Sequence, residues 1–437
     1  MTGSGGNTEM RWQALPNAPH ASSRTDDLWF VDAQRGWAVN SNGHILHTAD
    51  GGDSWQRQAS IFRAYLRCIG FADDRRGWVG TLDASQRLLH TPDGGVTWST
   101  VTGLPAAAPP AICGLSVVNE RVAYGSGTNE PGLPTGVIKT VDGGATWTAQ
   151  AMGEHATLLV DVYFRDQRRG WVVGGKAPDD VADPDRDDVL PVVLATEDGG
   201  ATWENRLAAI AGELRKGEWG WKIQFVTEDL GYVSLEAMDD AAILKTEDGG
   251  RTWTRLPVAD PQNNANLEGI GFVDEHLGWV GGWGDAQFEG GFTSETSDGG
   301  ATWQDANSVG KFLNRFRFIH EPELVGYASG DTIYKYAPAP AGGEVERAAP
   351  PQFTRTRLPV RIPVDVPADA GRVRVDLWDR FGRHLATPAD LTSPPPGAQE
   401  VAWSGETESG RAPHGGIVIA RVTIDDDAES RTLLVED

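Results

Sequence analysis

Carboxylates are the side chains of this sequence whose spacing could do chemistry. Asp183, Asp185 and Asp187 alternate with other residues, and carboxylate oxygens at this spacing can gather around Ca²⁺. The segment lacks the central glycine and the distal glutamate of a helix–loop–helix calcium site, and the whole chain is acidic. A solvated loop is therefore the favoured interpretation, and neither a metal nor a cofactor is expected.

A second set of aspartates belongs to an octet that occurs six times. It reads T-x-D-G-G-x-T/S-W, as in Thr246–Trp253, and its tryptophan recurs at intervals of 43 to 56 residues. The aspartate can accept hydrogen bonds from the amides that follow it, the glycines supply positive φ, and the tryptophan can cover the turn. A catalytic group at six equivalent places is implausible. The octet aspartates are therefore interpreted as structural: Asp50, Asp93, Asp142, Asp198, Asp248 and Asp298.

Another signature, upstream of the octets, predicts two strands of each repeat. In Phe30–Val39 an apolar strand ends at the phenylalanine, a polar turn follows, and a strand begins at Gly-Trp. A further copy, Phe318–Ser329, has no octet after it. Because Arg11–Pro16 resembles the residues that follow an octet, Trp12 is expected to supply an outer strand to Asn314–Tyr336 and so to close a ring.

The octet resembles the Asp-box, or BNR, repeat of β-propeller blades. Together with the Phe…Gly-Trp signature, it looks most like the photosystem II assembly and stability factor family. The resemblance implies an all-β fold, with a seven-bladed β-propeller over residues 11–336. It also implies a protein outside the cytoplasm that binds a partner and has no enzymatic chemistry. The expected partner is a protein or a glycan, and a monomer is expected.

The composition changes after Tyr336. Residues 337–352 are a Pro/Ala/Gly linker, and residues 353–437 alternate as short strands. The second segment resembles the Ig-like β-sandwich domains of flagellar hook-capping proteins and of type IX secretion sorting tails, although it ends in LLVED where a sorting tail usually ends with basic residues. The motifs that carry the resemblance are D-x-x-G-R (Asp379, Gly382, Arg383), W-S-G (Trp403–Gly405) and the glycine-spaced run Ser409–Val418.

Loop lengths predict which face of the propeller carries function. The turns within the two signatures are short and alike, and they lie on one face. The connections between second and third strands, and those between blades, lie on the opposite face and vary in length, as in Gly174–Pro191 and Glu204–Gly220. Loops vary where function is built, so this variable-loop face is the expected binding face. Within it, Asn205–Lys216 is expected to form a short helix.

Inner-strand residues one and three before each phenylalanine are expected to converge on the central channel near that face. Aromatic, polar and charged groups in a concave site favour ligand binding. The alternative is a plug, in which these groups pair with one another, Asp27 with Arg315 or Arg317. Both interpretations concern the same residues: Asp27, Trp29, Asp161, Tyr163, Lys222, Gln224, Arg315 and Arg317.

A glycoside hydrolase is the alternative function, with paired carboxylates in the channel as in a sialidase or a xyloglucanase. A sialidase needs an Arg-Ile-Pro motif ahead of the boxes, whereas Arg361–Pro363 lies in the second domain. Xyloglucanases usually set two propellers around a cleft, and one is expected here. A binding module is therefore the favoured interpretation.

Four arginines precede the Gly-Trp position, or its equivalent, in consecutive blades. They would form a basic arc on the face of the short turns, where an acidic partner could bind; solvated turn residues are the other interpretation. The basic arc consists of Arg35, Arg76, Arg121 and Arg169.

Charge and hydropathy limit the class of partner. The net charge of −24 argues against nucleic-acid binding, and no apolar run is long enough to span a membrane, which leaves a lipid anchor or surface attachment open. Residues 1–10 are expected to be flexible and resemble a mature export start whose leader was replaced by Met1, which favours an extracytoplasmic location. For Cys68 and Cys113, two buried free thiols are favoured over one disulfide.

Overall fold

The computed structural model of this protein describes residues 8–19, 24–237, 240–261, 264–285, 287–288, 292–306, 309–340, 353–408, 410 and 416–436. Most of the expected flexible start (1–7), most of the linker (341–352), and residues 409 and 411–415 of the glycine-spaced run lie outside these residues. β-strands are the main regular secondary structure of the described chain, which also has two short 3-10 helices, η1 (Arg186–Asp188) and η2 (Ala208–Glu213). None of its helices is long and apolar enough to cross a membrane.

Seven four-stranded antiparallel sheets make up the described chain as far as Pro340. Six of them are consecutive in sequence: β2 (Thr25–Phe30), β3 (Gly36–Asn40), β4 (His44–Thr48), β5 (Gln56–Ser60); β6 (Leu66–Phe71), β7 (Gly77–Thr81), β8 (Leu88–Thr91), β9 (Ser99–Thr100); β10 (Gly114–Val117), β11 (Ala123–Gly127), β12 (Gly136–Thr140), β13 (Thr148–Ala151); β14 (Leu158–Phe164), β15 (Gly170–Lys176), β16 (Leu190–Thr196), β17 (Glu204–Asn205); β18 (Trp219–Phe225), β19 (Gly231–Glu236), β20 (Ala242–Thr246), β21 (Thr254–Pro257); β22 (Ala265–Phe272), β23 (Gly278–Gly284), β24 (Thr293–Thr296), β25 (Gln304–Asp305). The remaining sheet joins β26 (Arg315–Ile319), β27 (Val325–Ser329) and β28 (Ile333–Pro340) to β1 (Thr8–Ala14).

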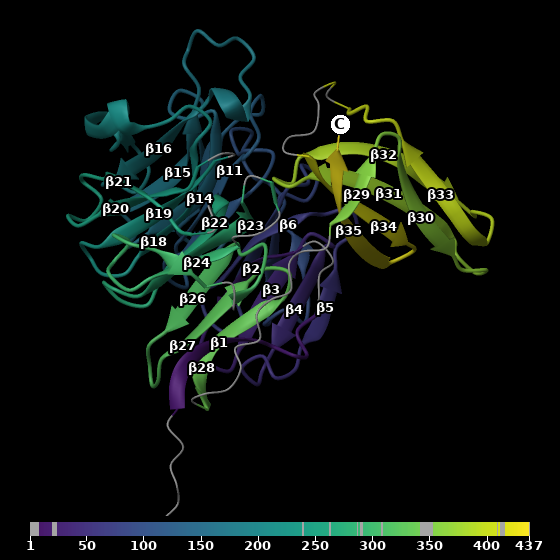
Figure 1. The fold of residues 1–437 in the computed structure, drawn as a ribbon, viewed down its shortest axis with the longest axis horizontal. Coiled ribbons are helices and arrows are strands. Elements are labelled where there is room, and N and C mark those ends of the chain that lie inside the picture. The colour runs from purple at the N-terminus through teal and green to yellow at the C-terminus, as the bar shows by residue number, and fades with distance from the viewer. Residues whose placement is uncertain are drawn as a thin grey trace, which may run out of the picture.

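The sheets form a closed ring. The first strand of each sheet packs against the first strand of the next, from β2 through β22 to β26, and β26 packs against β2. This is the arrangement of a β-propeller, in which inner strands surround a central channel. Figure 1 shows the ring on the left, with the C-terminal strands against one side of it.

Strands from both ends of the ring segment meet in one sheet. β1 is antiparallel to β28, with Trp12 opposite Tyr336, and Figure 1 shows purple β1 beside green β28. The pairing also takes in Thr8–Arg11 and Ala337–Pro340, so both strands extend beyond the expected limits at residues 11 and 336. The reason is that each strand satisfies the backbone groups of the other.

Aromatic rings join neighbouring sheets at the two sequence signatures. The phenylalanine that ends an inner strand stacks on the aromatic ring of the neighbouring sheet's Gly-Trp/Tyr position, as Phe71 does on Trp37 with centroids 3.7 Å apart. The octet tryptophan stands edge-on to the phenylalanine of its own sheet, as Trp55 does to Phe30 at 6.2 Å. Trp12 has the same relation to Phe318 at 6.1 Å, so it takes the place of the missing octet tryptophan.

Each octet is a self-contained turn. In the first copy, Asp50 Oδ1 accepts hydrogen bonds from Ser54 N (2.9 Å) and Thr48 Oγ1 (2.8 Å), and Oδ2 accepts one from Ser54 Oγ (2.6 Å). Gly51 and Gly52 have φ of 70° and 92°, which favour glycine at both positions. The hydrogen bonds from Ser54 and Thr48 lower the pKa of Asp50 to about 2, so the turn holds an ionised carboxylate.

Residues 353–436 form a separate C-terminal unit. β29 (Thr354–Arg357), β35 (Asp427–Glu436), β34 (Ile417–Ile424), β31 (Arg372–Asp379) and β32 (His384–Thr392) make a five-stranded sheet, and β30 (Val360–Val366) pairs with β33 (Gly397–Trp403). One apolar cluster joins both sheets, with Val364 and Trp403 from the small sheet and Val375, Leu385 and Val418 from the large one. The unit therefore has its own core.

Candidate functional site

Backbone bulges bring polar side chains into the central channel. The pairing of β2 with β3 shifts register between Thr25 and Asp27, and the pairing of β14 with β15 shifts between Leu159 and Asp161. A comparable shift lies between Gly220 and Ile223 in β18. A bulge breaks the alternation of side chains and re-aims one of them. Asp27, Asp161 and Lys222, three residues before their phenylalanines, lie at these shifts, and they meet Arg315 from the regularly paired strand β26 in the channel.

Arg315 links two of the expected channel carboxylates. Its Nε donates to Asp27 Oδ1 (3.0 Å), and its Nη1 and Nη2 donate to the two oxygens of Asp161 (both 2.9 Å). Asp27 also accepts a hydrogen bond from Leu28 N, and Asp161 accepts one from Ile223 N. Both carboxylates are only 1% exposed. The pairing of Asp27 with Arg315 is one of the two pairings that the plug interpretation allows.

Lys222 completes this inner layer without a hydrogen bond of its own. Its side chain is 1% exposed, and Nζ has no hydrogen-bond partner among the described residues. Burial, followed by repulsion from Arg315, lowers the pKa of Lys222 to about 8. Although burial raises the pKa of Asp161, the positive charges of Arg315 and Lys222 bring it below its usual value. The layer thus pairs two buried carboxylates with buried cations.

The other four expected channel residues do not join this layer. Arg317 stacks on Trp29, with its Cζ 4.3 Å from the ring centroid. Tyr163 stacks on Phe225 of the next sheet at 5.2 Å, and Gln224 exchanges two hydrogen bonds with the main chain of Phe272. The expectation that all eight side chains meet is therefore wrong for Tyr163 and Gln224, because contacts between neighbouring sheets hold them.

A second polar layer, which sequence reasoning missed, lies beside the first. Asp26 accepts hydrogen bonds from Arg24 Nε (2.9 Å) and Arg67 Nη1 (2.7 Å), and Arg24 also pairs with Glu268. All four side chains are fully buried. Trp221 lies under Arg67, with the guanidinium 4.6 Å from the ring centroid. The signal was available: Asp26, Arg67, Trp221 and Glu268 each lie four residues before the phenylalanine that ends their strand.

The centre of the variable-loop face is covered by the C-terminal unit. Arg380 and Phe381, in the turn between β31 and β32, are both fully buried. Arg380 Nη1 lies 2.7 Å from Glu236 Oε1, at the end of β19, and Asn129 Nδ2 donates to the carbonyl of Phe381 (2.8 Å). The expectation of an open binding channel on this face therefore needs correction, because the chain itself fills the channel mouth.

Glu236 is the carboxyl group of the channel mouth with the most altered acidity. Burial raises its pKa strongly, the charge of Arg380 lowers it, and repulsion from Glu268 raises it further. A raised pKa is the property that general acid catalysis requires of a carboxyl group. Glu236 is fully buried beneath Arg380, however, so no substrate reaches it in this conformation.

The basic arc lies on the other face, and most of its arginines contact carboxylate or carbonyl groups of the same turn or of the next one. Arg35 pairs with Asp32 at 2.8 Å and with Asp74, and Arg169 pairs with Asp166 at 2.8 Å. Arg76 Nη1 donates to the carbonyl of Glu120 (2.8 Å) in the next repeat. Arg121 is exposed at the equivalent turn. The arc is therefore a line of turn-stabilising arginines on the exposed side of the ring.

The acidic loop is organised around a helix cap. Asp185 caps η1 by accepting a hydrogen bond from Arg186 N (2.7 Å), and its own amide donates to Asp188. In the described part of the chain, no three His, Cys, Asp or Glu side chains gather in a way that could hold a metal ion. Cys68 and Cys113 are buried free thiols.

Comparisons with known proteins agree on the fold. The family model of the photosynthesis system II assembly factor YCF48 matches residues 7–153. A solved structure of YCF48 bound to D1 peptide is 19% identical with a TM-score of 0.53, covering 75% of this chain and 96% of its own. YCF48 from Cyanidioschyzon merolae is 18% identical, with a TM-score of 0.52 and coverages of 74% and 98%.

A glycoside hydrolase has a similar fold. The GH74 enzyme of Niastella koreensis is 12% identical with a TM-score of 0.52, covering 96% of this chain and 73% of its own. No curated protein matches the chain. At these identities the likeness concerns the fold alone, which is a β-propeller of the BNR type.

Proposed function

We propose that this chain is a non-catalytic, seven-bladed Asp-box propeller with a C-terminal Ig-like β-sandwich, and that it binds a protein partner as an assembly factor does. Two observations support the role: the match of residues 7–153 to the YCF48 family, and a solved YCF48 structure that holds a peptide. The proposal extends the family's binding role to this chain, without its photosynthetic partner. It places the protein outside the cytoplasm, on the resemblance alone.

The carboxylates of the central channel are buried and paired with a cation, and this supports a function without catalysis. A glycosidase needs one protonated and one ionised carboxyl group, both within reach of a sugar. Asp27 and Asp161 share the cation Arg315 and are almost fully buried. The pKa of Asp161 lies below its usual value, and a substrate cannot approach either carboxylate.

A glycoside hydrolase remains the second candidate because of Glu236 and Glu268. These fully buried carboxyl groups repel one another in the channel mouth, and the fold is similar to that of GH74 enzymes. Hydrolysis would require the C-terminal unit to leave the channel mouth. The same carboxyl groups could instead bind a cationic group of a partner, and that binding involves no catalytic step.

The test uses the full chain in two assays. Incubation with xyloglucan and with a sialoside is expected to release no sugar, and sugar release that Glu236→Gln abolishes would establish the hydrolase. Chemical cross-linking in native envelope fractions is expected to join the chain to one protein in fixed proportion. If only unrelated, abundant proteins are cross-linked, and purified cross-linked candidates show no saturable binding, the binding role is contradicted.

A further inference from the structure

The D-x-x-G-R motif of the C-terminal unit builds a turn that presents two side chains. The carboxylate of Asp379 accepts hydrogen bonds from Phe381 N (3.0 Å), Arg383 N (2.9 Å) and Arg383 Nε (3.1 Å). Gly382 has φ of 86°, and a Cβ there would lie 2.3 Å from Leu82 of the ring. Asp379, Gly382 and Arg383 therefore fix the backbone, while the two x positions, Arg380 and Phe381, point into the ring.

The ring holds Phe381 in an aromatic and cationic pocket. Trp219 meets it edge-on with centroids 5.4 Å apart, and Trp221 lies at 6.1 Å. Arg186 of η1 covers its face, with Cζ 4.1 Å from the centroid. Together with the hydrogen bond from Asn129, these contacts come from three different sheets or their loops. The pocket is therefore assembled by the packing of three consecutive sheets.

Arg380 meets the acidic side of the channel mouth. Glu236 lies 2.7 Å from its Nη1, yet the two atoms do not have the geometry of a hydrogen bond. Phe288 of the sixth sheet's loop lies 5.5 Å from the guanidinium. Desolvation offsets much of the attraction in a buried ion pair, but removing one partner is costly because it leaves the other charge buried and unpaired. This contact therefore makes the site selective for a guanidinium.

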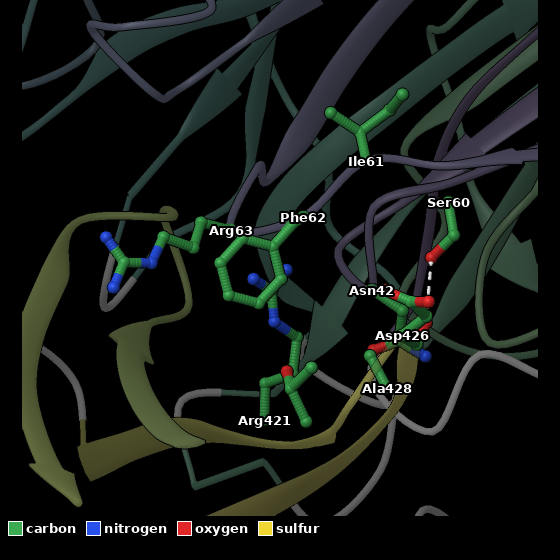
Figure 2. A pocket seen from close by; sticks show the side chains of 9 residues that line it. Asn42, Ser60, Ile61, Phe62, Arg63, Arg421, Asp426 and Ala428 are labelled. Carbon is green, nitrogen blue, oxygen red and sulfur yellow. Dashed lines mark hydrogen bonds between the residues drawn. The ribbon is translucent and has the colours of Figure 1, made fainter. Parts of the chain in front are cut away.

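The interface around the turn is partly open. An apolar cluster, with Trp378 and Ile419 of the C-terminal unit against Phe312 of the ring, holds the unit in place. Pockets flank the contact. Figure 2 shows one of them, which is lined by Phe62 and Arg63 of the ring and by Arg421 of the C-terminal unit, among other residues. Another is lined by Tyr65, Leu82, Trp378 and His384, among other residues. An outside ligand can therefore approach the rim of the interface from the solvent.

We propose that the channel mouth is a binding site for a peptide turn that presents an arginine beside an aromatic side chain, and that residues 379–383 occupy it as a displaceable internal ligand. The tether raises the effective concentration of the internal ligand, so an outside peptide meets a strong competitor. This inference rests on the binding role proposed above, and it specifies where the ligand binds and which class of ligand it is. The proposal does not depend on the identity of a natural partner.

The experiment measures binding of a synthetic cyclic peptide with the sequence DRFGR, labelled with a fluorophore, to full-length protein. The double variant Arg380→Ala/Phe381→Ala is expected to bind it at least tenfold more tightly than the parent, since it no longer fills the site. Adding Glu236→Gln to the double variant should weaken peptide binding at least fivefold. A peptide with Arg and Phe replaced by Ala should not bind.

A lock variant provides the matched control. The side chains of Asn42 in the ring and Ser430 in the C-terminal unit form a hydrogen bond, so Asn42→Cys/Ser430→Cys can join the two parts by a disulfide. Oxidised, this variant should bind no peptide, and reduction should restore the parent's weak binding. If the double variant melts as a folded protein but does not bind the peptide, the proposal is overturned. Phe381→Ala alone replaces the double variant if the latter fails to fold. Because the probe is a synthetic peptide, a negative result in this binding assay is distinct from a negative result in the cross-linking test of the proposed function.

Discussion

Aspartates hold both the outer rim and the central channel of the ring, but their partners lie at very different distances along the chain. On the rim, Asp298 is bound by Thr296 and Thr302, within four residues on either side. In the channel, Asp161 is bound by Arg315, which is 154 residues away. Each rim turn can therefore fail alone, whereas the channel layer forms only when the ring has closed. Perturbation of the rim should have small, separable effects, and perturbation of the channel or the seam should have large ones.

The seam between β1 and β28 should give the largest effect. Removal of residues 1–16 exposes the edge of β28 and deletes Trp12 and Leu15, both 7% exposed. From the cost of deleting two buried side chains, we expect a loss of at least roughly 5 kcal/mol in the free energy of unfolding, or aggregation. Thermal melting and size-exclusion chromatography measure it. Removal of residues 1–7 alone is the control, and it should melt like the parent. Equal melting of the longer truncation would mean that the seam carries no stability.

Arg315→Ala should be the next most damaging change. It leaves Asp27 and Asp161 buried without their cation, which should cost about 3–5 kcal/mol in urea unfolding. Replacing all three together, by Arg315→Met, Asp27→Leu and Asp161→Leu, removes the unpaired charges and should recover much of the loss. A single variant as stable as the parent would show that solvent or Lys222 rearranges to satisfy the carboxylates, and the comparison of rim and channel would lose its basis.

Asp248→Ala on the rim should cost only about 1 kcal/mol, because the amides of Arg251 and Thr252 that it leaves unpaired are exposed to water. The same change at Asp298 should cost a similar amount, and the two losses should add, since the sites share no contact. Urea unfolding of both single variants and of the double variant tests this. Strong non-additivity would contradict the independence of the rim turns.

Acid should produce the smallest and most gradual effect. Hydrogen bonds from Thr302, together with one from Thr296, lower the pKa of Asp298 from 3.8 to about 2. A depressed pKa contributes stability above the unfolded value, and this is lost as the pH falls from 3.8 toward 2. The difference in melting temperature between the parent and Asp298→Asn should therefore shrink over this range. A difference that stays constant down to pH 2 would exclude the ionised carboxylate as its source.

Local hydrogen bonding explains why the rim could be predicted from the sequence. The partners of Asp50 lie within its own octet, so the pattern is written out again in every repeat. Trp12 could be placed opposite the last inner strands for the same reason, because its neighbours repeat the sequence after an octet. In both cases the prediction rests on a repeated stretch of sequence and not on knowledge of a contact between distant residues.

Contacts created by closure explain what the sequence did not reveal. The residues Asp26, Arg67 and Glu268 share a position four before a phenylalanine, but the bulges that bring them together are not marked by any residue type in these strands. The helix expected over Asn205–Lys216 shrinks to the 3-10 helix η2, whose first residue follows Leu207, a position without a capping hydrogen bond. The insertion of Phe381 depends on the fit of two separately folded surfaces, which no local pattern records.

The pairing of β1 with β28 also imposes a delay during biosynthesis, because the two strands are made at different times. β1 is made first, but its partner strand begins at Ile333. At roughly 5–20 residues per second, a ribosome takes on the order of tens of seconds to make the intervening chain. During that time a strand with an apolar tryptophan has no sheet to join. A rearranged chain that begins at Thr25 and carries Thr8–Ala14 after Pro340, joined to it by a two-residue turn, would end this wait, and its folding in the cell should depend less on chaperones.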